Sequence, residues 1–563
     1  MRLRLNTSLN AIFLAAVLAG CASVPTPPAA PVSKAPVSVK VLAINDFHGN
    51  LKPPLGGIRI KDPANPGKSI NVDAGGAEYL ATAVAQMRAK NPNHIFVAAG
   101  DLIGASPLLS ALFHDEPTVE AMSLMGLEAS SVGNHEFDKG LDELLRMQKG
   151  GCHPTDGCKG PQTFKGASYQ YLAASTVEVA TGKTVFPPYH VKTFQGIPVA
   201  FIGLTLQATP SMVVPAGVAG LKFGNEADTI NALVPGLRAQ GIEAIVVLIH
   251  EGGTPVGDYN ECPGISGPIV EVVKRLDRAV DLIVTGHTHR AYNCRIDGRL
   301  VTSGDKYGTI VTEIDLVLDP TTRDVVSASA NNVIVRNDTF AKNPPQTALI
   351  AQYEQRAGDL ARRVVGRITA ALPRDGSPAG ESVLGQVVAD AQLAATQSAG
   401  AQIAFMNPGG IRAALGLAAD GQVRYEDVFS VQPFYNSLIT MTVSGAQVLQ
   451  LLEQQWRGQG DGPISGRVMQ VSSGFSYSWD SQAPVGQRIV PGSVKLNGVA
   501  INPAANYRVT VNAFMASGGD NYLALKDGTE RATGMPDVDA LEVYIKNHPG
   551  LAPGALPRIQ RLN

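Results

Sequence analysis

The sequence predicts an α/β fold in its first half and a smaller α+β domain in its second half. The first half contains five apolar runs that are continuous rather than alternating, which is the pattern of buried parallel strands. An amphipathic helical pattern follows Pro344 and Pro345, and Pro is favoured in the first turn of a helix. From about Val365 the pattern changes to short strands mixed with helices. We therefore expect two domains joined by a helix.

Each predicted strand of the first half ends in side chains that can bind a metal ion. The strands are Val39 to Ile44, Ile95 to Ala98, Ala129 to Val132, Ala244 to Ile249 and Leu282 to Thr285. The side chains that follow them are Asp46 and His48, Asp101, Asn134 and His135, His250, and His287 and His289. Ligands of open α/β sheets bind beyond the carboxyl ends of the strands, so these residues are expected to converge. Asp, Asn and His suit Zn, Mn or Fe, and no motif contains the thiolate of a Cys-type structural zinc site.

Four motifs at these strand ends match a known family. They are NDFHGN at Asn45 to Asn50, GDLIGASP at Gly100 to Pro107, GNHEFD at Gly133 to Asp138 and GHTH at Gly286 to His289. In order and context they resemble the calcineurin-like metallophosphoesterase domain of the bacterial periplasmic and animal ecto-5'-nucleotidases. The resemblance implies a four-layered α/β/β/α domain and a metal-dependent phosphoric ester hydrolase.

The resemblance also implies a centre of two divalent metal ions, Zn, Mn or similar. One ion is expected to bind Asp46, His48, Asp101 and His289, and the other Asp101, Asn134, His250 and His287, so that Asp101 bridges them. Two such ions polarise the phosphoryl oxygens and lower the pKa of a bound water. His135 is expected to stabilise charge on the phosphoryl group or leaving oxygen, with Asp138 orienting its ring.

The second half begins after the predicted linker helix, residues 341–365. Its apolar face is expected to comprise Leu349, Ile350, Tyr353, Ala357, Leu360 and Val364. Beyond it we expect strands at Gln402 to Met406, Ser437 to Val443 and Val468 to Trp479, a helix at Ala446 to Trp456, and a hairpin near Leu496-Asn497-Gly498.

Three segments of this half resemble the 5'-nucleotidase C-terminal domain: Asn407 to Arg412, Gln432 to Asn436, and Phe514 to Tyr522. The resemblance implies that Asn407 and Arg412 contact the substrate, that Phe434 and Phe514 sandwich the base, and that Asp520 holds the ribose hydroxyls. The chain departs from the family pattern in having Tyr435 where Gly is usual. It also has no Arg between Arg374 and Arg412, so this domain is expected to make fewer cationic contacts to the phosphate than in relatives.

The N-terminus is predicted to be a targeting segment. Arg2 and Arg4 precede an apolar run from Ala11 to Ala19 that is too short to span a bilayer comfortably. Leu18 to Cys21 resembles the bacterial lipoprotein processing box, which implies a signal peptide of residues 1–21, lipidation of Cys21 and an outer-membrane anchor in the periplasm. The alternative is an ordinary signal peptide with a stray Cys. Residues 22–37 are rich in Pro and Ala and are expected to form an extended tether.

Four cysteines remain after Cys21, namely Cys152, Cys158, Cys262 and Cys294. Outside the cytoplasm, disulfides persist, and three pairings are possible. Locality favours Cys152 with Cys158 and Cys262 with Cys294. A zinc site in which His153 joins the cysteines is the alternative.

Composition and net charge do not favour a nucleic-acid-binding protein. Of the 563 residues 17% are charged and the net charge is only −2, so no basic field favours nucleic acid as a partner.

We expect a catalytic domain at residues 38–340 and a substrate-binding domain at residues 366–563. The expected reaction is hydrolysis of nucleoside 5'-monophosphates outside the cytoplasm. The alternatives are hydrolysis of UDP-sugars, dinucleotides or 2',3'-cyclic nucleotides at the same centre, and a non-enzymatic nucleotide-binding surface protein. The sequence does not predict the oligomeric state.

Overall fold

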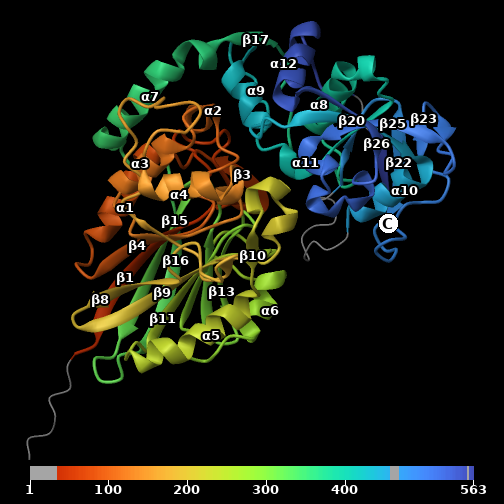
Figure 1. Ribbon diagram of the computed structural model, residues 1–563. Helices are drawn as coiled ribbons and strands as arrows, with labels where there is room; N and C mark the ends of the chain where they lie inside the picture. The colour runs from red at the N-terminus through yellow and green to blue at the C-terminus, as the bar shows by residue number, and fades with distance from the viewer. Residues whose placement is uncertain (1–34, 457–467, 555–556) are drawn as a thin grey trace, which may run out of the picture. The chain divides into compact units, whose positions relative to one another are not determined.

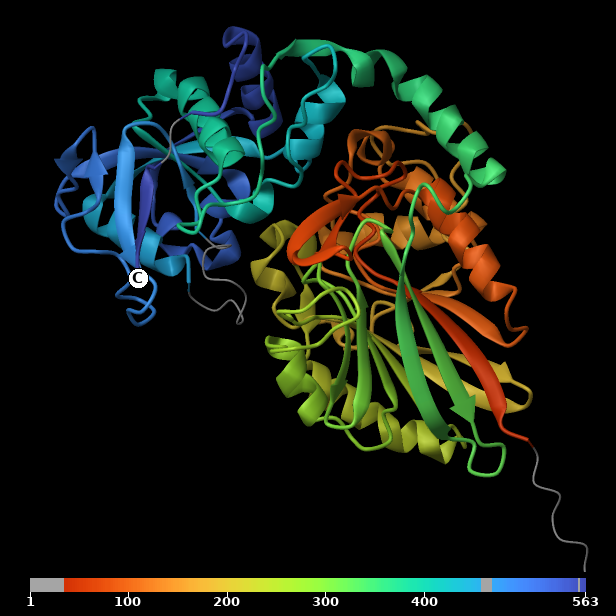
Figure 2. The same ribbon diagram turned by 180° about the vertical axis from the view of Figure 1, so that it is seen from behind.

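The first half of the chain builds two six-stranded sheets (Figures 1 and 2). The computed structural model describes residues 35–456, 468–554 and 557–563. Strands β1, β4, β5 and β6 of the first sheet run parallel, and β15 and β16 add antiparallel strands at one edge. In sheet order the strands are β16 (Val325–Ile334), β15 (Ile310–Leu318), β1 (Val37–Ile44), β4 (His94–Ala99), β5 (Ala129–Ser131) and β6 (Gln170–Leu172).

The second sheet has a parallel centre of β9, β11, β12 and β14 with an antiparallel strand at each edge. Its order is β13 (Ala291–Ile296), β14 (Arg299–Gly304), β12 (Leu282–Thr285), β11 (Ala244–His250), β9 (Ile197–Thr205) and β8 (Tyr189–Phe194). All five strands predicted from the apolar runs are present. Three of them lie in the first sheet and two in the second.

Helices cover the outer face of each sheet (Figure 1). The first sheet packs against α1 (Ala77–Arg88), α3 (Glu116–Leu124) and α4 (Leu141–Lys149), and the second against α5 (Glu226–Ala239) and α6 (Pro268–Lys274). Both faces of β1 are covered, which explains why this strand is mostly apolar: Val39 and Val41 pack between the sheets, whereas Leu42 and Ile44 pack under the helices. The predicted four-layered α/β/β/α fold is confirmed.

Smaller elements complete this half. They are α2 (Leu108–Ala111), the hairpin of β2 (Ile58–Asp62) and β3 (Asn65–Val72), and the pair β7 (Thr176–Glu178) and β10 (Leu221–Phe223).

The predicted linker helix is α7 (Pro344–Arg362). The side chain of Asn343 accepts a hydrogen bond from the amide of Gln346 and so caps the first turn. Ile350, Tyr353 and Ala357 are buried as expected, but Leu360 is 38% exposed and Val364 is 51% exposed. The prediction was wrong for these two. Val364 lies beyond the end of the helix at Arg362 and belongs to a strand, and Leu360 lies in the last turn of the helix and lines the cavity described below.

The second half is a mixture of short helices and strands, as predicted. Its main sheet has the order β21 (Gln470–Val471), β18 (Ile403–Met406), β25 (Asn506–Asn512), β20 (Ser437–Ser444) and β26 (Thr529–Pro536). A second sheet contains β24 (Val499–Ala500), β23 (Lys495–Leu496), β22 (Phe475–Asp480) and β27 (Ile559–Leu562), and β17 (Val364–Arg367) pairs with β19 (Gln422–Arg424). The helices are α8 (Val383–Ala395), α9 (Tyr425–Val431), α10 (Gly445–Gln454), α11 (Ala513–Ala516) and α12 (Asp537–Asn547).

One predicted strand of this half is divided. The run Val468 to Trp479 forms β21 and β22, which belong to different sheets, with a turn between them. Gly474 in that turn has φ +83° and lies so close to Asn497 that a Cβ would meet its side chain at 2.5 Å. The segment Ser472-Ser473-Gly474 was the available signal for this break. The hairpin at Asn497-Gly498 is confirmed, with both residues at positive φ.

Both disulfides predicted from locality are present, Cys152 with Cys158 and Cys262 with Cys294. The disulfides exclude the site in which cysteines bind zinc beside His153. The predicted signal peptide, most of the predicted tether and Cys21 lie outside the described residues. Within the described part of the chain, none of the helices has both the length and the hydropathy to cross a bilayer.

Candidate metal centre and substrate pocket

The polar ends of β1, β4, β11 and β12 meet and form two groups of metal-binding side chains. One group is Asp46, His48 and His289, and the other is Asp101, His250 and His287. Within each group the candidate ligand atoms lie within 4.8 Å of one another. Six of the seven residues predicted as ligands are therefore brought together in two sets.

Asp101 lies between the two groups. Its Oδ2 atom is 2.9 Å from Nε2 of His250 and 3.6 Å from Nε2 of His48. Asn134, the seventh predicted ligand, joins the second group, since its Oδ1 atom is 3.2 Å from Nδ1 of His287. Asp101 and Asn134 are both buried. The geometry suits a carboxylate shared by two ions.

The backbone at these residues is held in a conformation that side chains rarely adopt. Asp46, His48, Asp101, His287 and His289 all have φ between 46° and 71°. Such residues usually cost about 1 to 3 kcal/mol each, and they persist where a function requires the side-chain direction. Five left-handed residues in one site are a local sign of a functional centre.

Hydrogen bonds on the far side of two imidazoles direct their free nitrogens inward. Nδ1 of His48 lies 2.8 Å from the carbonyl oxygen of Gly104, and Nδ1 of His250 lies 2.8 Å from that of Ala99. A carbonyl only accepts, so each Nδ1 donates and each Nε2 is directed at the centre. Nε2 of His250 is buried and has no aligned hydrogen bond, as expected of an atom that binds an ion.

Two glycines allow the strand ends to approach this closely. A Cβ on Gly133 would lie 2.2 Å from Oδ1 of Asp101, and a Cβ on Gly286 would lie 2.8 Å from the carbonyl oxygen of Ala99 and 3.0 Å from Oδ2 of Asp46. The glycines of the GNHE and GHTH motifs are thus required because a Cβ atom would not fit at either position.

Burial and neighbouring charges shift the pKa values of several of the predicted ligands. Burial raises the pKa of Asp46 to about 7, with Asp101 adding to the rise and His250 opposing it. Burial also opposes the charged form of Asp101, but His250, His135 and His48 outweigh it and hold the pKa well below its usual range. Burial lowers the pKa of His287 to about 3 and that of His289 well below its usual range. Neutral imidazoles beside buried carboxylates are the form in which these residues bind a cation.

Sequence reasoning missed Glu136, which joins two of the motifs. Its buried carboxylate accepts hydrogen bonds from the amides of Asp101, Leu102 and Gly133 at 3.0, 2.8 and 2.6 Å. Asn45 acts similarly on the other side, donating to Asp46 and accepting from Gly304, both at 2.7 Å. Both residues stand within quoted motifs, so their positions beside ligands were the available signal.

Tyr307 was also missed. It follows β14, and its amide donates to the carbonyl oxygen of Asp46 at 2.7 Å. Its ring packs edge-on against the rings of His48 and His289. A sixth strand end therefore contributes to the site, and the sequence signal for it was the polar segment after the run ending at Gly304.

His135 lies beside the centre and makes the contact predicted for it. Its Nδ1 atom is 2.9 Å from Oδ2 of Asp138, and its backbone amide donates to Oδ1 of Asp101 at 2.9 Å. Burial opposes the charged ring, but Asp138 and Asp101 outweigh burial and raise the pKa of His135. The ring stacks on that of Phe434, with centroids 5.6 Å apart.

One cavity of about 1120 Å³ is lined by both sets of predicted residues. From the first half it includes Asn134, His135, Asp138 and His287, and from the second half Asn407, Arg412, Phe434, Phe514 and Asp520. Nη2 of Arg412 lies 3.4 Å from Nε2 of His48, and its guanidinium carbon lies 5.9 Å from the centre of the Phe434 ring. The predicted phosphate-binding Arg thus reaches the metal centre.

The remaining substrate residues form a connected polar network. Nδ2 of Asn407 donates to Oδ2 of Asp520 at 2.8 Å, and Nδ2 of Asn512 donates to Oδ1 of Asn407 at 2.9 Å. Phe514 lies against Gly519, where a Cβ would approach the ring to 2.4 Å. The amide network leaves the Asp520 carboxylate with free acceptor capacity.

Two residues bear on the departures from the family pattern, Tyr435 and Arg374. Tyr435 has φ +58°, which is a conformation that favours Gly, and its hydroxyl is 3.4 Å from Oδ2 of Asp539. Arg374 lies near Tyr307 and Arg412, and burial together with the charge of Arg412 lowers the pKa of its guanidinium. The charge of Arg374 also helps to lower the pKa of His289. The charge of a second cation of the second half, outside any quoted motif, therefore acts on the centre.

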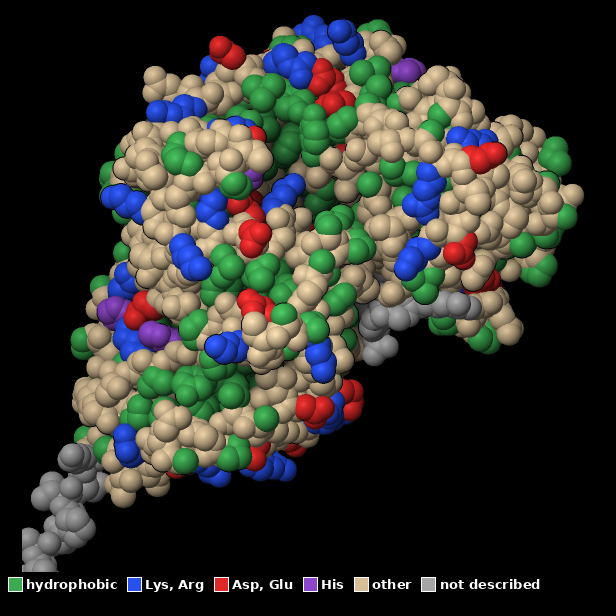
Figure 3. All heavy atoms as spheres, in the orientation of Figure 1, with side chains coloured by type: hydrophobic (Ala, Val, Ile, Leu, Met, Phe, Trp, Pro, Cys, Tyr) green, Lys and Arg blue, Asp and Glu red, His purple; other side chains and the backbone are tan. Residues whose placement is uncertain are grey.

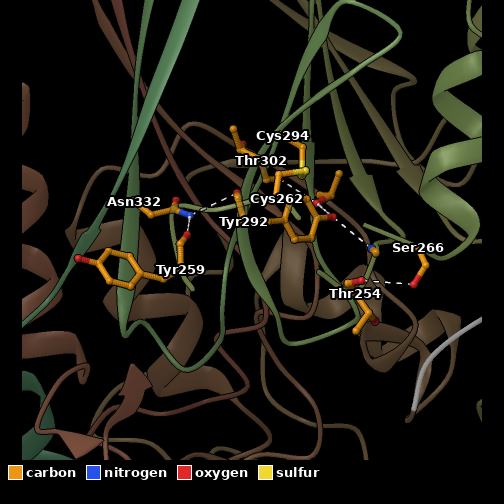
Figure 4. The surroundings of a disulfide bond; sticks show 10 residues. Thr254, Tyr259, Cys262, Ser266, Tyr292, Cys294, Thr302 and Asn332 are labelled. Carbon is orange, nitrogen blue, oxygen red and sulfur yellow. Dashed lines mark hydrogen bonds between the residues drawn. A yellow bond between two sulfur atoms is a disulfide. The ribbon is translucent and has the colours of Figure 1, made fainter. Parts of the chain in front are cut away.

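The disulfide of Cys262 with Cys294 fixes the loop that follows β11 (Figure 4). Around it, Asn332 donates to the carbonyl oxygens of Tyr259 and Ser303 at 2.6 and 3.0 Å. The hydroxyl of Tyr292 accepts a hydrogen bond from the amide of Gly253 at 3.2 Å. These contacts anchor the segment directly after His250 to β13 and β16.

Comparison with known proteins agrees with this geometry. The pattern of calcineurin-like phosphoesterases matches residues 39–291, and that of the 5'-nucleotidase C-terminal domain matches residues 364–527. The cell wall protein Lmo0130 of Listeria monocytogenes is 30% identical over 546 residues, which are 91% of this chain and 67% of the relative. The chain belongs to the 5'-nucleotidase family.

Two further relatives show how the family varies. The endonuclease YhcR of Bacillus subtilis is 32% identical over 514 residues; these are 91% of this chain but only 40% of that longer protein. The crystal structure of a 5'-nucleotidase precursor from Thermus thermophilus has a TM-score of 0.76 and 25% identity, and it covers 94% of this chain and 100% of that chain. The whole architecture is thus shared with a solved member of the family.

Proposed function

We propose that this protein hydrolyses phosphate esters of nucleosides with the help of two divalent metal ions, and that 5'-monophosphates are its substrates. The observation that supports this most strongly is one cavity, lined by the predicted ligands Asn134 and His287 and also by Arg412, Phe434, Phe514 and Asp520 of the second half. One part of the cavity suits a phosphate and the other a nucleoside. In this proposal residues 38–340 are the catalytic domain, 341–365 the linker and 366–563 the substrate-binding domain.

The residues that hold the ions follow from the two groups. Asp46, His48, Asp101 and His289 are assigned to one ion, and Asp101, Asn134, His250 and His287 to the other. When bound, such ions polarise the phosphoryl oxygens and lower the pKa of a water molecule. The donor set of nitrogen and oxygen atoms suits Zn or Mn.

The side chains around the ions have separate tasks. Arg412 lies beside His48, where it can pair with phosphoryl oxygens, and Arg374 adds a second positive charge. His135 is fixed by Asp138 and faces the cavity, so it can donate a hydrogen bond to the phosphoryl group or the leaving oxygen. The reaction breaks the bond between phosphorus and the ester oxygen and forms one to the water oxygen, and the leaving oxygen takes up a proton.

Phe434 and Phe514 are assigned to the base and Asp520 to the ribose hydroxyls. Aromatic stacking on a base contributes about 1 to 3 kcal/mol and does not depend on which base it is. Replacing either Phe by Ala is therefore expected to raise the KM for nucleoside monophosphates roughly ten-fold or more. p-Nitrophenyl phosphate has no nucleobase and is expected to respond much less.

Kinetics with both substrates test the assignment. If both Phe variants keep unchanged nucleotide kinetics while circular dichroism shows a folded protein, the two rings are packing residues and the claim shrinks to a general metallophosphatase. Arg412→Ala tests the phosphate grip independently, and it is expected to lower kcat/KM for both substrates because both carry the phosphate.

A second candidate is hydrolysis of larger substrates such as UDP-sugars, dinucleotides or cyclic nucleotides. Its support is the cavity of about 1120 Å³, which exceeds the range of roughly 300 to 1,000 Å³ typical of small-molecule sites. Phosphate release from a panel of mono-, di- and cyclic nucleotides and nucleotide sugars, measured after chelation and refilling with Mn, Zn, Co or Mg, decides between the two.

We further propose that the enzyme works in the cell envelope, anchored by a lipid on Cys21. The LAGC sequence at Leu18 to Cys21 and the two disulfides support a location outside the reducing cytoplasm. Cys21→Ser is expected to release the protein from the membrane fraction, as shown by fractionation and immunoblotting. Membrane retention of that variant would contradict the anchor.

A further inference from the structure

A second cluster of metal-binding side chains lies in the cavity wall outside the centre described above. His114, Glu143 and His153 offer ligand atoms that lie within 4.8 Å of one another. They come from three separate segments, the turn between α2 and α3, helix α4, and the loop closed by the Cys152–Cys158 disulfide. None of them has a role in the proposed reaction.

The two imidazoles face each other unusually closely. The rings of His114 and His153 are parallel within 4°, and their centres are 4.0 Å apart. Two protonated rings would repel at this distance, so the stack favours neutral rings, whose free lone pairs can bind a cation. Burial and the neighbouring His153 lower the pKa of His114, which agrees with a neutral ring.

The hydrogen bonding of the cluster is incomplete. Nε2 of His114 is buried and has no aligned hydrogen bond, although it lies 3.0 Å from Oδ2 of Asp156. Nδ1 of His153 accepts a hydrogen bond from the Asp156 amide at 3.2 Å and lies 3.2 Å from the Thr155 hydroxyl. An ion would give Nε2 of His114 the partner that it lacks.

The surrounding charges favour a cation. Glu143, Asp156 and Glu116 are matched by Arg146 and Lys159, which leaves one negative charge in excess. Glu143 accepts two hydrogen bonds from Arg146, at 2.7 and 2.8 Å, but each carboxylate oxygen keeps a second lone pair. Arg146 also donates hydrogen bonds to Glu116 and to the carbonyl oxygen of Gly151, so it can stay in place when Glu143 also binds an ion.

We propose that His114, His153 and Glu143, with Asp156 as a fourth ligand, bind a further divalent ion of the zinc class. Two imidazoles and two carboxylates are a ligand set that suits zinc. Ligand atoms about 2.1 Å from one tetrahedral ion lie roughly 3.4 Å apart, so the cluster has to close by at most about 1.4 Å. Since Glu143 and His153 line the same cavity as the metal centre, the ion adds positive charge to the wall along which a phosphate ester enters.

Zinc content of the full-length protein tests this inference. After equilibration with zinc at a fixed free concentration, wild type is expected to hold one ion per chain more than His153→Ala. Glu143→Gln keeps the side-chain size and is expected to weaken that binding at least ten-fold in calorimetric titration. His190→Ala, which removes a partly buried histidine of β8, is the control and is expected to match wild type.

The result does not depend on the two ions of the proposed catalytic centre. In an Asp101→Asn background the extra ion is expected to remain, and adding His153→Ala is expected to remove it. Equal zinc content and affinity in wild type, His153→Ala and Glu143→Gln, with all three folded by circular dichroism, would overturn the site while leaving the proposed phosphoesterase function untouched.

Discussion

At the scale of single residues, hydrogen bonds to the rest of the protein decide which ring nitrogens are directed at the metal centre. His48 and His250 each donate from Nδ1 to a backbone carbonyl, which leaves Nε2 for an ion. Asp101 lies within 3.6 Å of both groups, whereas His135 contacts Asp138 and Phe434 and belongs to neither group. The two residues adjoin the same centre but have different tasks.

That difference leads to a prediction for Asp101 and His135. Asp101→Asn is expected to lower kcat far more than it changes KM, and to reduce the metal bound per chain, because the shared carboxylate is lost. His135→Ala is expected to lower kcat by roughly 10²- to 10⁴-fold while the metal content stays unchanged. Elemental analysis alongside steady-state kinetics separates the two, and loss of metal from the His135 variant would show that it is a ligand.

Asp520 allows a prediction about pH. Burial raises its pKa to about 6, against the opposing effects of Asn407 and His135. The carboxylate that we propose to accept from the ribose hydroxyls is therefore mostly ionised above about pH 6 and mostly protonated below it. The inhibition constant of a nucleoside, which carries no titrating phosphate, is expected to rise roughly ten-fold between pH 7 and pH 5.

Asp520→Asn is the control for this pH dependence, and its inhibition constant is expected to stay flat over the same range. A similar slope in the variant would assign the titration to another group. The folded pKa lies above the usual value, so the stability that Asp520 contributes is present at low pH and lost as the pH rises through about 6.

At the scale of elements, ligands on different strands must be held in register with one another. Glu136 connects the ends of β4 and β5 through three backbone amides, and Asn45 connects β1 to the end of β14. The Cys262–Cys294 disulfide and Asn332 hold the loop after β11 (Figure 4). These connections keep the strained ligand residues in place.

Removing this disulfide is expected to weaken both folding and metal binding. The bond joins residues 32 apart, and closing a loop of that length in the unfolded chain contributes about 3 to 4 kcal/mol. Cys262→Ser with Cys294→Ser is expected to lower the free energy of unfolding by that amount and to weaken metal affinity through His250. Denaturant unfolding and zinc titration measure the two effects.

The pair Cys152→Ser with Cys158→Ser serves as a comparison, because its loop is only 6 residues long and is remote from β11. It is expected to destabilise the protein less and to leave affinity at the catalytic centre unchanged. Equal losses in both pairs would mean that the longer disulfide does not support the centre specifically.

At the scale of the whole molecule, acidic and basic side chains are interspersed on the surface (Figure 3), whereas buried carboxylates are found in the site. Acidic and basic side chains are interspersed over the face shown in Figure 3, in keeping with a net charge of −2. The buried carboxylates of Asp46 and Asp101 are balanced locally rather than by any overall field. Stability is therefore expected to depend on the metal ions.

Metal removal is expected to lower the melting temperature. An ion that binds only the folded state stabilises it by about 4 kcal/mol when its free concentration is 1,000 times its Kd. Chelation followed by dialysis should lower the Tm measured by calorimetry, and refilling with Zn or Mn should restore it. In Asp101→Asn the metal-dependent part of this shift is expected to shrink, and an unchanged shift would locate the stabilising ions elsewhere.

The sequence by itself determined the strands, their polar ends and the family, because continuous apolar runs and short motifs are local signals. It did not reveal that the strand ends come from two sheets, that Glu136 joins the ends of β4 and β5, or that Leu360 and Val364 are exposed. Nor was the break at Gly474 predicted. These features depend on contacts between residues far apart in the chain. Arg374, Tyr307 and the pair of His114 with His153 became visible only when folding placed them together, since no local pattern records which distant side chain will be the neighbour.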